Sequence, residues 1–454
     1  MKNCLSSWLS LLVLLTLDVA ASPPNFSFMP SEISNKLSQK SVRQIYQDHI
    51  GYLWLVTQEG ISRYDGYQVI SFVHDPRKTN SLSSDNAQQL IQDKKQRLWV
   101  ATDGGGINLF NAEDHSFSSW KVAENPVAGP SSNRLQTLYL DDAGYLWLGY
   151  RDGNFSRLDP EQKTFVHFNS RDLLPAIKKD APITSIVEDT NFIWLATDGN
   201  GLLRLDKKTQ SLSHYTTHTD LALPSNRLTQ LLVDHQQRLW LTSFDSGIGM
   251  LDAQRTSLKL WLHNASDPDS LLANFVHTVY QDQKYRIWLG TDKGVSLWDG
   301  RNKFYNYSQG FTDPKILSIL QDKSGLVWLG TFQGVTKSIE VPFEHIDKGL
   351  ASNVILGFAE TTSSLGEVST WVASYGGLTQ LDQFGKVKKL LTQDSHPSLF
   401  DVRVMTIKGD RNLLWFGTRG GGLGRLDLDT NTIRQFSHDP NNPGSLSFNG
   451  ATSI

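Results

Sequence analysis

The chain has 454 residues, of which 20% are charged, and a formal net charge of -3. This length exceeds one ordinary domain, so two or more units are expected, although propellers and barrels can extend a single domain further. The near balance of charge gives no electrostatic reason to expect nucleic acid or an anionic membrane as a partner. Thirteen Trp and 35 Gly beside only four Met indicate many short strands and turns rather than a helical bundle.

The first 22 residues have the pattern of a secretory signal peptide, with Lys2, an apolar run over residues 5–17 and a small-residue cleavage site at 19–21. A retained N-terminal anchor is the alternative, but the run is shorter than the roughly 20 residues that span a bilayer. Cys4 is the only cysteine and lies inside this segment, too early to be a lipoprotein acylation site. We therefore expect an exported mature protein without thiols, disulfides or cysteine-bound metal.

A repeat dominates the rest of the chain. Its tryptophans recur at intervals of 40 to 48 residues: Trp54, Trp99, Trp147, Trp194, Trp240, Trp288, Trp328, Trp371 and Trp415. In eight of the nine copies an acidic residue precedes the tryptophan by five or six positions: Asp48, Asp93, Asp141, Asp189, Asp234, Asp282, Asp322 and Asp410. In the remaining copy Glu360 precedes Trp371 by 11 positions, which indicates an insertion in that turn.

Each copy divides into four short β runs separated by turn residues. In the copy around Trp147 the runs are residues 135–140, 145–149, 154–158 and 165–168. Four strands in such a repeat are typical of one blade of a β-propeller, whose sheets pack face to face around an axis. We interpret the repeat tryptophan, on the second strand, as the large apolar filler between neighbouring blades.

Nine copies exceed the roughly four to eight blades of one ring, so the predicted fold is all-β, with one seven-bladed β-propeller over residues 23–340. The first blades of a second, incomplete propeller are expected over residues 341–454. Residues 26–28 (Phe-Ser-Phe) resemble an outer strand without a blade, and we expect them to complete the blade of Trp328 and close the ring. Residues 343–346 stand in the same relation to the Trp371 copy.

The end of the chain repeats an earlier connector. Residues 438–447 repeat the His-Asp-Pro…Ser-Leu-Ser pattern of residues 74–83, and the sequence then stops at Ile454, inside the expected first strand of a tenth blade. We expect the chain to be a piece of a longer protein.

The repeat Asp-x-x-Gly-x-Leu-Trp-Leu-Gly-Thr-x-x-Gly-Leu-x-x-Leu-Asp, with its His-Asp-Pro…Ser-Leu-Ser connectors, resembles the two-component regulator propeller repeat. The resemblance implies two seven-bladed propellers outside the cytoplasmic membrane, followed by a β-sandwich, a transmembrane helix and a histidine kinase or diguanylate cyclase output. It also implies oligosaccharide ligands and a possible homodimer of the full-length receptor, anchored in the membrane by a part beyond this chain. The sequence contains no kinase histidine box and no Gly-Gly-Asp-Glu-Phe signature, so the type of output is not readable.

Enzymatic and cofactor motifs are weak. The glycine clusters at residues 104–106 and 420–422 fall at the turn between second and third strands, not between a strand and a helix, so they do not predict a phosphate site. The repeated Asp residues occupy the same place in every blade, whereas catalytic carboxylates would converge on one site. His74, His277 and His438 lack the spacing of metal ligands. We expect no catalytic residues, no metal and no cofactor in this chain.

A polar row is expected to line the central channel. It consists of the residues four positions before each acidic marker, between apolar neighbours on the innermost strand: Gln44, Gln89, Thr137, Ser185, Gln230, Thr278 and Ser318, with Leu356 and Thr406 in the last two copies. Lining the channel does not by itself imply ligand binding.

Other candidates for ligand contact lie outside the repeat positions. Trp120, Trp261 and Trp298 have the rings to stack on sugars, but they fall where sister copies have Leu, Phe or Tyr, so a packing role is the alternative. Arg43, Arg134, Arg227 and Arg403 lie near the starts of first strands, on the connector face, where they can meet anionic groups or remain solvated.

Two functions remain open. The preferred one is a periplasmic region that binds an oligosaccharide or similar small ligand and controls a cytoplasmic output. The alternative is a secreted propeller enzyme, a lyase or hydrolase, that acts on polysaccharide.

Overall fold

A computed structural model describes residues 24–177, 179–341, 349–364, 366–382, 385–397, 399 and 401–454. The predicted signal peptide, with Cys4, and the predicted strand at residues 343–346 lie outside these described residues. The chain divides into two units, one over Phe26–Glu340 and a second that contains Val341–Ile454.

Within the described residues, the unit Phe26–Glu340 contains seven four-stranded antiparallel sheets. Their first strands are β2 (Gln44–Gln47), β6 (Ala87–Gln92), β10 (Leu135–Leu140), β14 (Ile183–Glu188), β18 (Leu228–Val233), β22 (Val276–Gln281) and β26 (Ile316–Gln321). The second strands, which carry the repeat tryptophans, are β3 (Leu53–Thr57), β7 (Leu98–Thr102), β11 (Leu146–Tyr150), β15 (Phe192–Thr197), β19 (Leu239–Ser243), β23 (Ile287–Thr291) and β27 (Val327–Thr331).

The remaining strands form the outer half of each sheet. The third strands are β4 (Gly60–Tyr64), β8 (Gly106–Asn111), β12 (Phe155–Asp159), β16 (Leu202–Asp206), β20 (Ile248–Leu251), β24 (Gly294–Trp298) and β28 (Gly334–Glu340). The outer strands are β5 (Val69–Phe72), β9 (Ser116–Trp120), β13 (Thr164–Phe168), β17 (Leu212–Tyr215), β21 (Leu258–Trp261), β25 (Phe304–Tyr307) and β1 (Phe26–Pro30). Short helices η1 (Glu32–Asn35), η2 (Pro126–Ala128) and α1 (Ser170–Leu173) lie in the connections.

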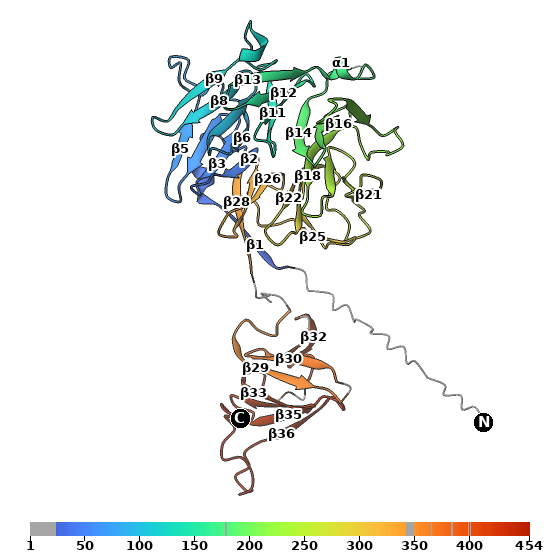
Figure 1. Cartoon of the computed structure of the whole chain (residues 1–454). Coiled ribbons are helices and arrows are strands. Elements are labelled where there is room, and N and C mark those ends of the chain that lie inside the picture. The colour runs from blue at the N-terminus through green and yellow to red at the C-terminus, as the bar shows by residue number, and fades with distance from the viewer. Residues whose placement is uncertain are drawn as a thin grey trace, which may run out of the picture. The chain divides into compact units, whose positions relative to one another are not determined.

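The first strands follow one another around a closed circle. Each contacts the first strand of the next sheet, and β26 contacts β2, so the last sheet meets the first. Figure 1 shows the sheets in chain order around this circle, from blue β2 through green β14 to orange β26. The predicted all-β propeller fold is confirmed.

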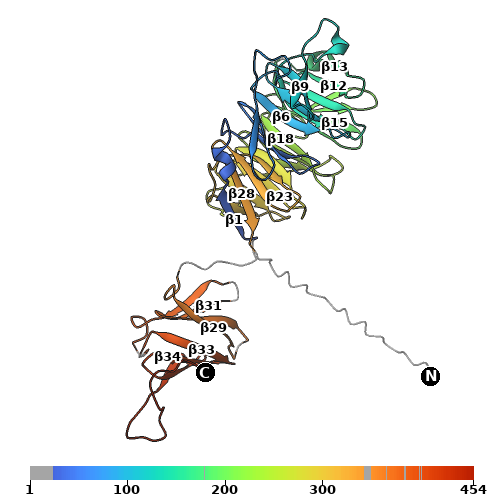
Figure 2. The same ribbon diagram turned by 90° about the vertical axis from the view of Figure 1, so that its left-hand side faces the viewer.

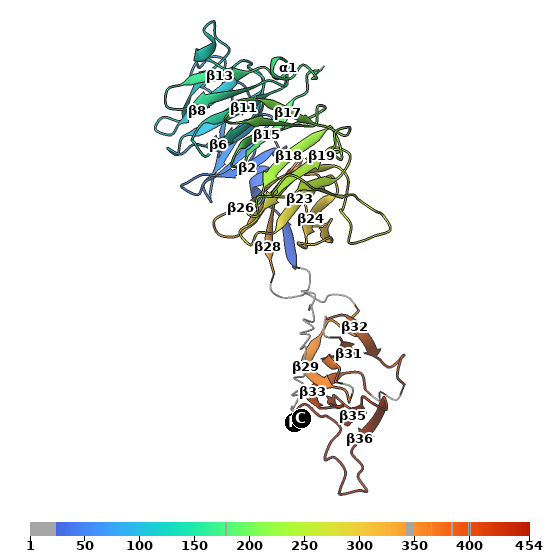
Figure 3. The same cartoon turned by 45° about the vertical axis from the view of Figure 1, so that its right-hand side comes forward.

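The N-terminal strand closes the ring. β1 pairs antiparallel with β28 in the sheet of Trp328, with Phe26 opposite Glu340 and Pro30 opposite Thr336; the blue β1 lies beside the orange β28 in Figure 2 and Figure 3. Phe26 is buried against Trp288, with ring centroids 4.7 Å apart. The predicted pairing of residues 26–28 with this blade is confirmed, and it joins the two ends of the ring by hydrogen bonds and by aromatic packing.

Each repeat tryptophan of the ring packs on the next blade. Trp54 shares an apolar cluster with Leu90 and Val100 of the following sheet, and Trp328 shares one with Ile45 and Leu55 of the first sheet. The acidic marker holds the indole in place: in all seven blades its carboxylate accepts the indole N–H, at 2.7 to 2.9 Å. The repeated Asp residues therefore have a structural role.

The glycine of the Trp-Leu-Gly motif permits a close approach between blades. A Cβ at Gly290 would lie 2.5 Å from Thr278 and 2.8 Å from the carbonyl oxygen of Ile316 in the next blade. A Cβ at Gly330 would lie 2.3 Å from Ser318 and 2.7 Å from the Val42 carbonyl. Because backbone atoms cannot move aside cheaply, a side chain at these positions would force the first strands apart.

The described part of the second unit contains two four-stranded sheets. They are β29 (Ile355–Thr362), β30 (Val368–Ser374), β31 (Gly377–Leu381), β32 (Val387–Leu391), and β33 (Val404–Asp410), β34 (Leu413–Thr418), β35 (Leu423–Asp427), β36 (Thr432–Phe436). The first strands β29 and β33 lie next to each other. Trp371 donates its indole N–H to the hydroxyl of Thr361, at 3.0 Å. The sequence interpretation that made Glu360 the marker of this copy is therefore wrong by one residue.

Candidate functional site: the axial cavity of the ring

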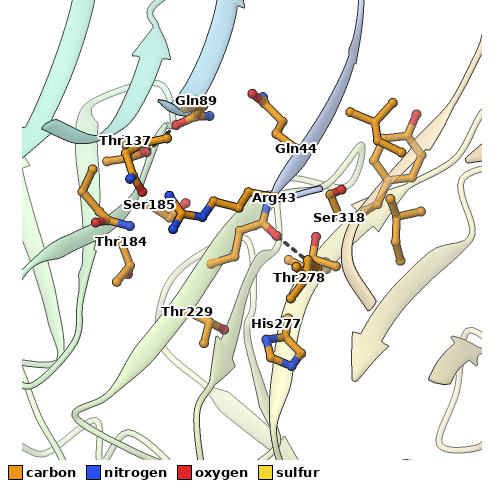
Figure 4. Close-up of a pocket in the computed structure, with 18 of the residues that line it drawn as sticks. Arg43, Gln44, Gln89, Thr137, Thr184, Ser185, Thr229, His277, Thr278 and Ser318 are labelled. Carbon is orange, nitrogen blue, oxygen red and sulfur yellow. Dashed lines mark hydrogen bonds between the residues drawn. The ribbon is translucent and has the colours of Figure 1, made fainter. Parts of the chain in front are cut away.

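The first strands of the ring enclose a cavity of about 600 Å³. All seven side chains of the predicted channel row, from Gln44 to Ser318, line it. Figure 4 shows Arg43 extending from the start of β2 into this cavity, with Thr137 and Ser185 on one side and Thr278 on the other. The cavity reaches the turns between second and third strands, where it is lined by Gln58, Arg151, Phe244 and Phe332.

A second tier of side chains lines the cavity one position before the predicted row. It consists of Arg43, Gln88, Gln136, Thr184, Thr229, His277 and Leu317. In six of the seven first strands the pairing register shifts at this position, for example between Val276 and Thr278 in β22. A bulge places two successive residues opposite one on the partner strand, so both can face the same side.

The sequence analysis identified Arg43 in this tier and missed its cavity-facing neighbours, although the sequence contains a signal for them. Strict alternation was assumed, yet every first strand of the ring reads apolar, variable, polar, apolar, as in Ile183–Ile186 or Val276–Val279. Two inner residues between apolar ones break the period of a regular strand. Such a break predicts a bulge, and with it a second inward-facing side chain per blade.

Most of the predicted row also joins neighbouring blades. Gln44, Gln89 and Gln230 accept the backbone N–H of Leu90, Leu138 and Val279, at 2.7, 2.7 and 2.8 Å. Ser185 accepts the N–H of Leu231, at 3.1 Å. These bonds satisfy amide groups on the open edge of the first strands, each of which has a partner strand on one side only. Part of the polar lining is therefore explained by the architecture of the ring.

Four lining residues have a buried side-chain atom without a hydrogen-bond partner among the described residues: Ser41 Oγ, Arg151 Nε, His277 Nε2 and Ser318 Oγ. Arg151 is engaged in an ion pair with Asp103, and His277 and Ser318 belong to the two tiers of first-strand residues. They lie on the consecutive first strands β22 and β26, and the next strand around the circle, β2, follows Arg43 directly. Buried polar groups without a protein partner usually meet water or a ligand.

The charge of the cavity wall is positive. Arg43 and Arg151 are its only Lys, Arg, Asp or Glu among the described lining residues. Burial lowers the pKa of the Arg43 guanidinium, the charge of Arg151 lowers it further, and Asp103 acts in the opposite sense. Arg151 pairs with Asp103 at 2.9 Å, whereas Arg43 donates from Nη1 to the neutral oxygens of Asn86 and Ala87, at 2.9 and 3.2 Å.

The imidazole of His277 is neutral at physiological pH. Burial lowers its pKa to about 4, with a further small decrease from Lys315 and an opposing effect of Asp292. The ring stacks on Phe275, with centroids 4.1 Å apart. A neutral imidazole offers one donor and one acceptor to whatever occupies the cavity.

The other predicted arginines lie outside the cavity lining. Arg134 pairs with Asp103 at 3.0 Å and Arg227 pairs with Asp198 at 2.8 Å, both at exposed positions. In the second unit Arg403 pairs with Asp401 at 2.9 Å. Of the arginines proposed from sequence, the structure thus brings only Arg43 into the cavity, and the other three are already paired with carboxylates.

The tryptophans outside the repeat pack inside the sheets. Trp261 and Trp298 are each 8% exposed and surround Trp240, at centroid distances of 5.7 and 4.9 Å. Trp120 lies 5.6 Å from Trp99 and beneath the ammonium group of Lys163. The prediction of sugar stacking is corrected for Trp261 and Trp298, because their ring faces are covered by neighbouring blades.

The described residues contain no group of three or more His, Cys, Asp or Glu side chains placed to hold a metal ion. In the same part of the chain, no helix is long and apolar enough to cross a membrane.

Comparison with protein families supports the interpretation of the repeat. Residues 270–293 and 310–333 match the family model described as two component regulator propeller. These two stretches are two component regulator propeller repeats. The resemblance recognised from the Trp-Leu-Gly-Thr motif is confirmed.

A curated protein with such similarity is histidine kinase P4 of Formosa agariphila, which is 35% identical over 69 residues. The matched stretch covers 15% of this chain and 5% of that kinase.

Among solved structures, the extracellular domain of the hybrid two component system BT3049 of B. thetaiotaomicron has a TM-score of 0.73 and 19% identity. The match covers 91% of this chain and 55% of that one, so the chain spans little more than half of it. Virginiamycin B lyase of Staphylococcus aureus has a TM-score of 0.54 and 13% identity, over 70% of this chain and all of the lyase. At these identities the likeness shows the propeller fold.

Proposed function

We propose that this chain is the periplasmic ligand-sensing region of a membrane-anchored bacterial signalling receptor with a histidine kinase or diguanylate cyclase output. The observation that carries the proposal is the combination of two component regulator propeller repeats with a polar axial cavity in a closed ring. Its ligand is an oligosaccharide or a similar small molecule, and dimerisation through the full-length receptor transmits the signal.

The size and lining of the cavity support small-molecule binding. Ligand pockets have volumes of about 300 to 1,000 Å³ and combine apolar surface with a few placed polar groups. The axial cavity, of about 600 Å³, lies in this range and combines Phe244, Phe332 and Leu317 with hydroxyl, amide and guanidinium groups. The innermost strands that line it are the elements in contact around the whole ring, so a ligand there touches several blades at once.

The repeated carboxylates are engaged in structural hydrogen bonds, which argues against glycoside hydrolysis. That chemistry needs two carboxylates about 5 to 10 Å apart on one site. In the ring, the Asp of each blade is engaged with the indole of its own tryptophan, as Asp234 is with Trp240 at 2.8 Å. The described lining of the axial cavity contains no Asp or Glu.

A lyase is the second candidate, because one observation favours it. His277 lines the cavity with a neutral imidazole whose buried Nε2 has no partner among the described residues, and a neutral imidazole can remove a proton adjacent to a carboxylate group. The fold is shared with a lyase, but the fold alone does not imply the activity.

Deletion of the gene in the source bacterium tests the sensing role. Transcripts should be measured after exposure to a panel of oligosaccharides, with the complemented strain as control. Loss of the response to one class of sugar, restored by the wild-type gene, is the expected result. An unchanged response to every sugar would contradict sensing, and release of unsaturated product from polysaccharide by the purified chain would favour the lyase.

A further inference from the structure

We propose that the axial cavity of the ring binds an anionic sugar of one or two rings, with its carboxylate on Arg43 and its hydroxyl groups on the arc formed by His277 and Ser318. This inference deepens the sensing role and rests on it for its biological meaning, but it is tested by binding alone.

The first argument is charge. The cavity holds two guanidinium groups, Arg43 and Arg151, and no Asp or Glu among its described lining residues. Like charges that are removed from water and brought close together destabilise each other. The nearby carboxylate of Asp103 already pairs with Arg134 and Arg151. An anion in the cavity would supply the missing counter-charge, whereas a zwitterionic amino acid would find no carboxylate for its ammonium group.

The second argument is the geometry of Arg43. Only its Nη1 donates to described residues, and both acceptors, Asn86 Oδ1 and Ala87 O, are uncharged. Guanidinium groups bind carboxylates by two parallel N–H···O bonds along one edge. Figure 4 shows the side chain reaching into the cavity, and its nitrogens other than Nη1 donate to no side chain or carbonyl among the described residues.

The third argument is the pair of unpartnered atoms. Ser318 Oγ and His277 Nε2 are buried without a protein partner among the described residues, on neighbouring first strands. Both atoms are covered in the ring, and Ser318 Oγ lies against Gly330 of its own sheet, so the two side chains must turn toward the cavity to meet a ligand. A hydroxyl group of a sugar both donates and accepts, so it can then pair with a hydroxyl and a neutral imidazole in either tautomer. The apolar surface of Phe244 and Phe332 at the turn end suits the C–H face of a sugar ring.

Calorimetric titration of the whole chain tests the proposal. The probes are glucuronate, digalacturonate, glucose as the uncharged match and glucose 6-sulfate as the other anion. We expect at least one uronate to bind more than about 10-fold more tightly than glucose, because a charge-assisted bidentate contact is lost in the neutral sugar.

Variants locate the site. Arg43→Gln should weaken uronate binding by about 10- to 100-fold, and Arg43→Lys by less, since it keeps the charge without the planar fork. Ser318→Ala should weaken binding of uronate and glucose alike. Arg403→Gln, the same change in the other unit, is the matched control and should leave affinity unchanged. Circular dichroism and thermal unfolding show whether each variant is folded. If Arg43→Gln does not fold, the affinity of Arg43→Lys is the result that tests the site.

Several results would overturn the proposal: no binding of either uronate at millimolar concentration, equal affinity for glucuronate and glucose, or unchanged affinity in folded Arg43 variants. Binding of glucose 6-sulfate in preference to both uronates would overturn the assignment of a carboxylate. If the receptor responds to a sugar and the Arg43→Gln variant binds that sugar with unchanged affinity, the proposed site is refuted and the sensing role is not. Uronate binding at Arg43 without any transcriptional response would refute sensing and leave the site intact.

Discussion

The ring and the second unit are built from the same repeat, yet equivalent apolar side chains can be buried in the ring and exposed in the second unit. In the ring, the residue after the channel row is covered by the preceding blade: Ile319 is 6% exposed and shares an apolar cluster with Trp288 of that blade. Phe358, the corresponding residue in β29, is 67% exposed. The sheets themselves are alike, with four strands and the same register shift in the first strand.

The tryptophans show the same contrast within the second unit. Trp371 is 1% exposed, because it packs in a cluster with Leu414 and Phe416 of the following sheet. Trp415, which lies in that following sheet, is only partly buried. A blade therefore stabilises the one before it, and the stability of a repeat depends on its neighbour more than on its own sequence.

The largest expected difference between the two units is in proteolysis. Limited digestion of the whole chain should cut within residues 341–454 at least about 100-fold faster than within the ring, because open sheet faces and edges lower the cost of local unfolding. Mass spectrometry of the fragments over time measures this. A second unit as resistant as the ring would mean that two blades suffice for a stable unit.

Tryptophan truncation sharpens the comparison. Trp240→Ala should destabilise the ring by about 3 to 5 kcal/mol, because it leaves a cavity in a cluster with Trp261 and Trp298. Trp415→Ala should cost less than about 2 kcal/mol, since that side chain is only partly buried. Denaturant unfolding followed by circular dichroism gives both values, with Trp240→Phe as a milder control. Equal losses would contradict stabilisation by the following blade.

The features that could be predicted from the sequence are those that depend on residues within a single repeat. The four β runs of the Trp147 copy agree with β10 to β13 within about one residue, since turn residues and alternation mark their ends. The pairing of β1 with β28 was predicted because an outer strand without a blade and a blade without an outer strand complement each other.

The features that sequence reasoning missed depend on neighbouring blades. The second tier could be predicted only by reading the break in alternation as a bulge. Thr361 takes the place of the acidic marker because β29 and β30 are each two residues longer than β26 and β27, so the added residues extend the strands and not the turn between them. Whether Trp261 and Trp298 face solvent is decided by the blade packed against them, and this contact is not encoded in the spacing. The ion pairs of Arg134 and Arg227 likewise join the connectors to other blades.

Acid should destabilise the ring through His277. Burial lowers its pKa to about 4 in the folded state, below the value of about 6.5 in an unfolded chain. The unfolded chain therefore binds a proton first, and stability present above pH 6.5 is lost as the pH falls toward 4, by about 3 kcal/mol at most.

Denaturant unfolding of the ring at pH 7 and at pH 4.5 measures this loss. His277→Gln should remove part of the pH dependence, and His396→Gln, at a far less buried position of the second unit, is the matched control. An unchanged pH profile in His277→Gln would show that other groups cause the acid sensitivity.

The smallest expected effect concerns the hydrogen bond that replaces the Asp–Trp contact in the second unit. Thr361 is buried and its hydroxyl accepts the indole N–H of Trp371, whereas the neighbouring Thr362 is exposed. Thr361→Val keeps the shape and removes the acceptor, so the indole loses its partner at a cost of about 1 kcal/mol. Thr362→Val should change the free energy of unfolding by close to nothing.

A double-mutant cycle shows whether the Thr361 change acts through the indole. If it does, the loss of unfolding free energy in the Thr361→Val, Trp371→Phe double variant should be smaller than the sum of the two single losses, because both changes remove the same bond. Strict additivity in this double-mutant cycle would show that the contact contributes nothing, and that the buried hydroxyl matters only for its packing.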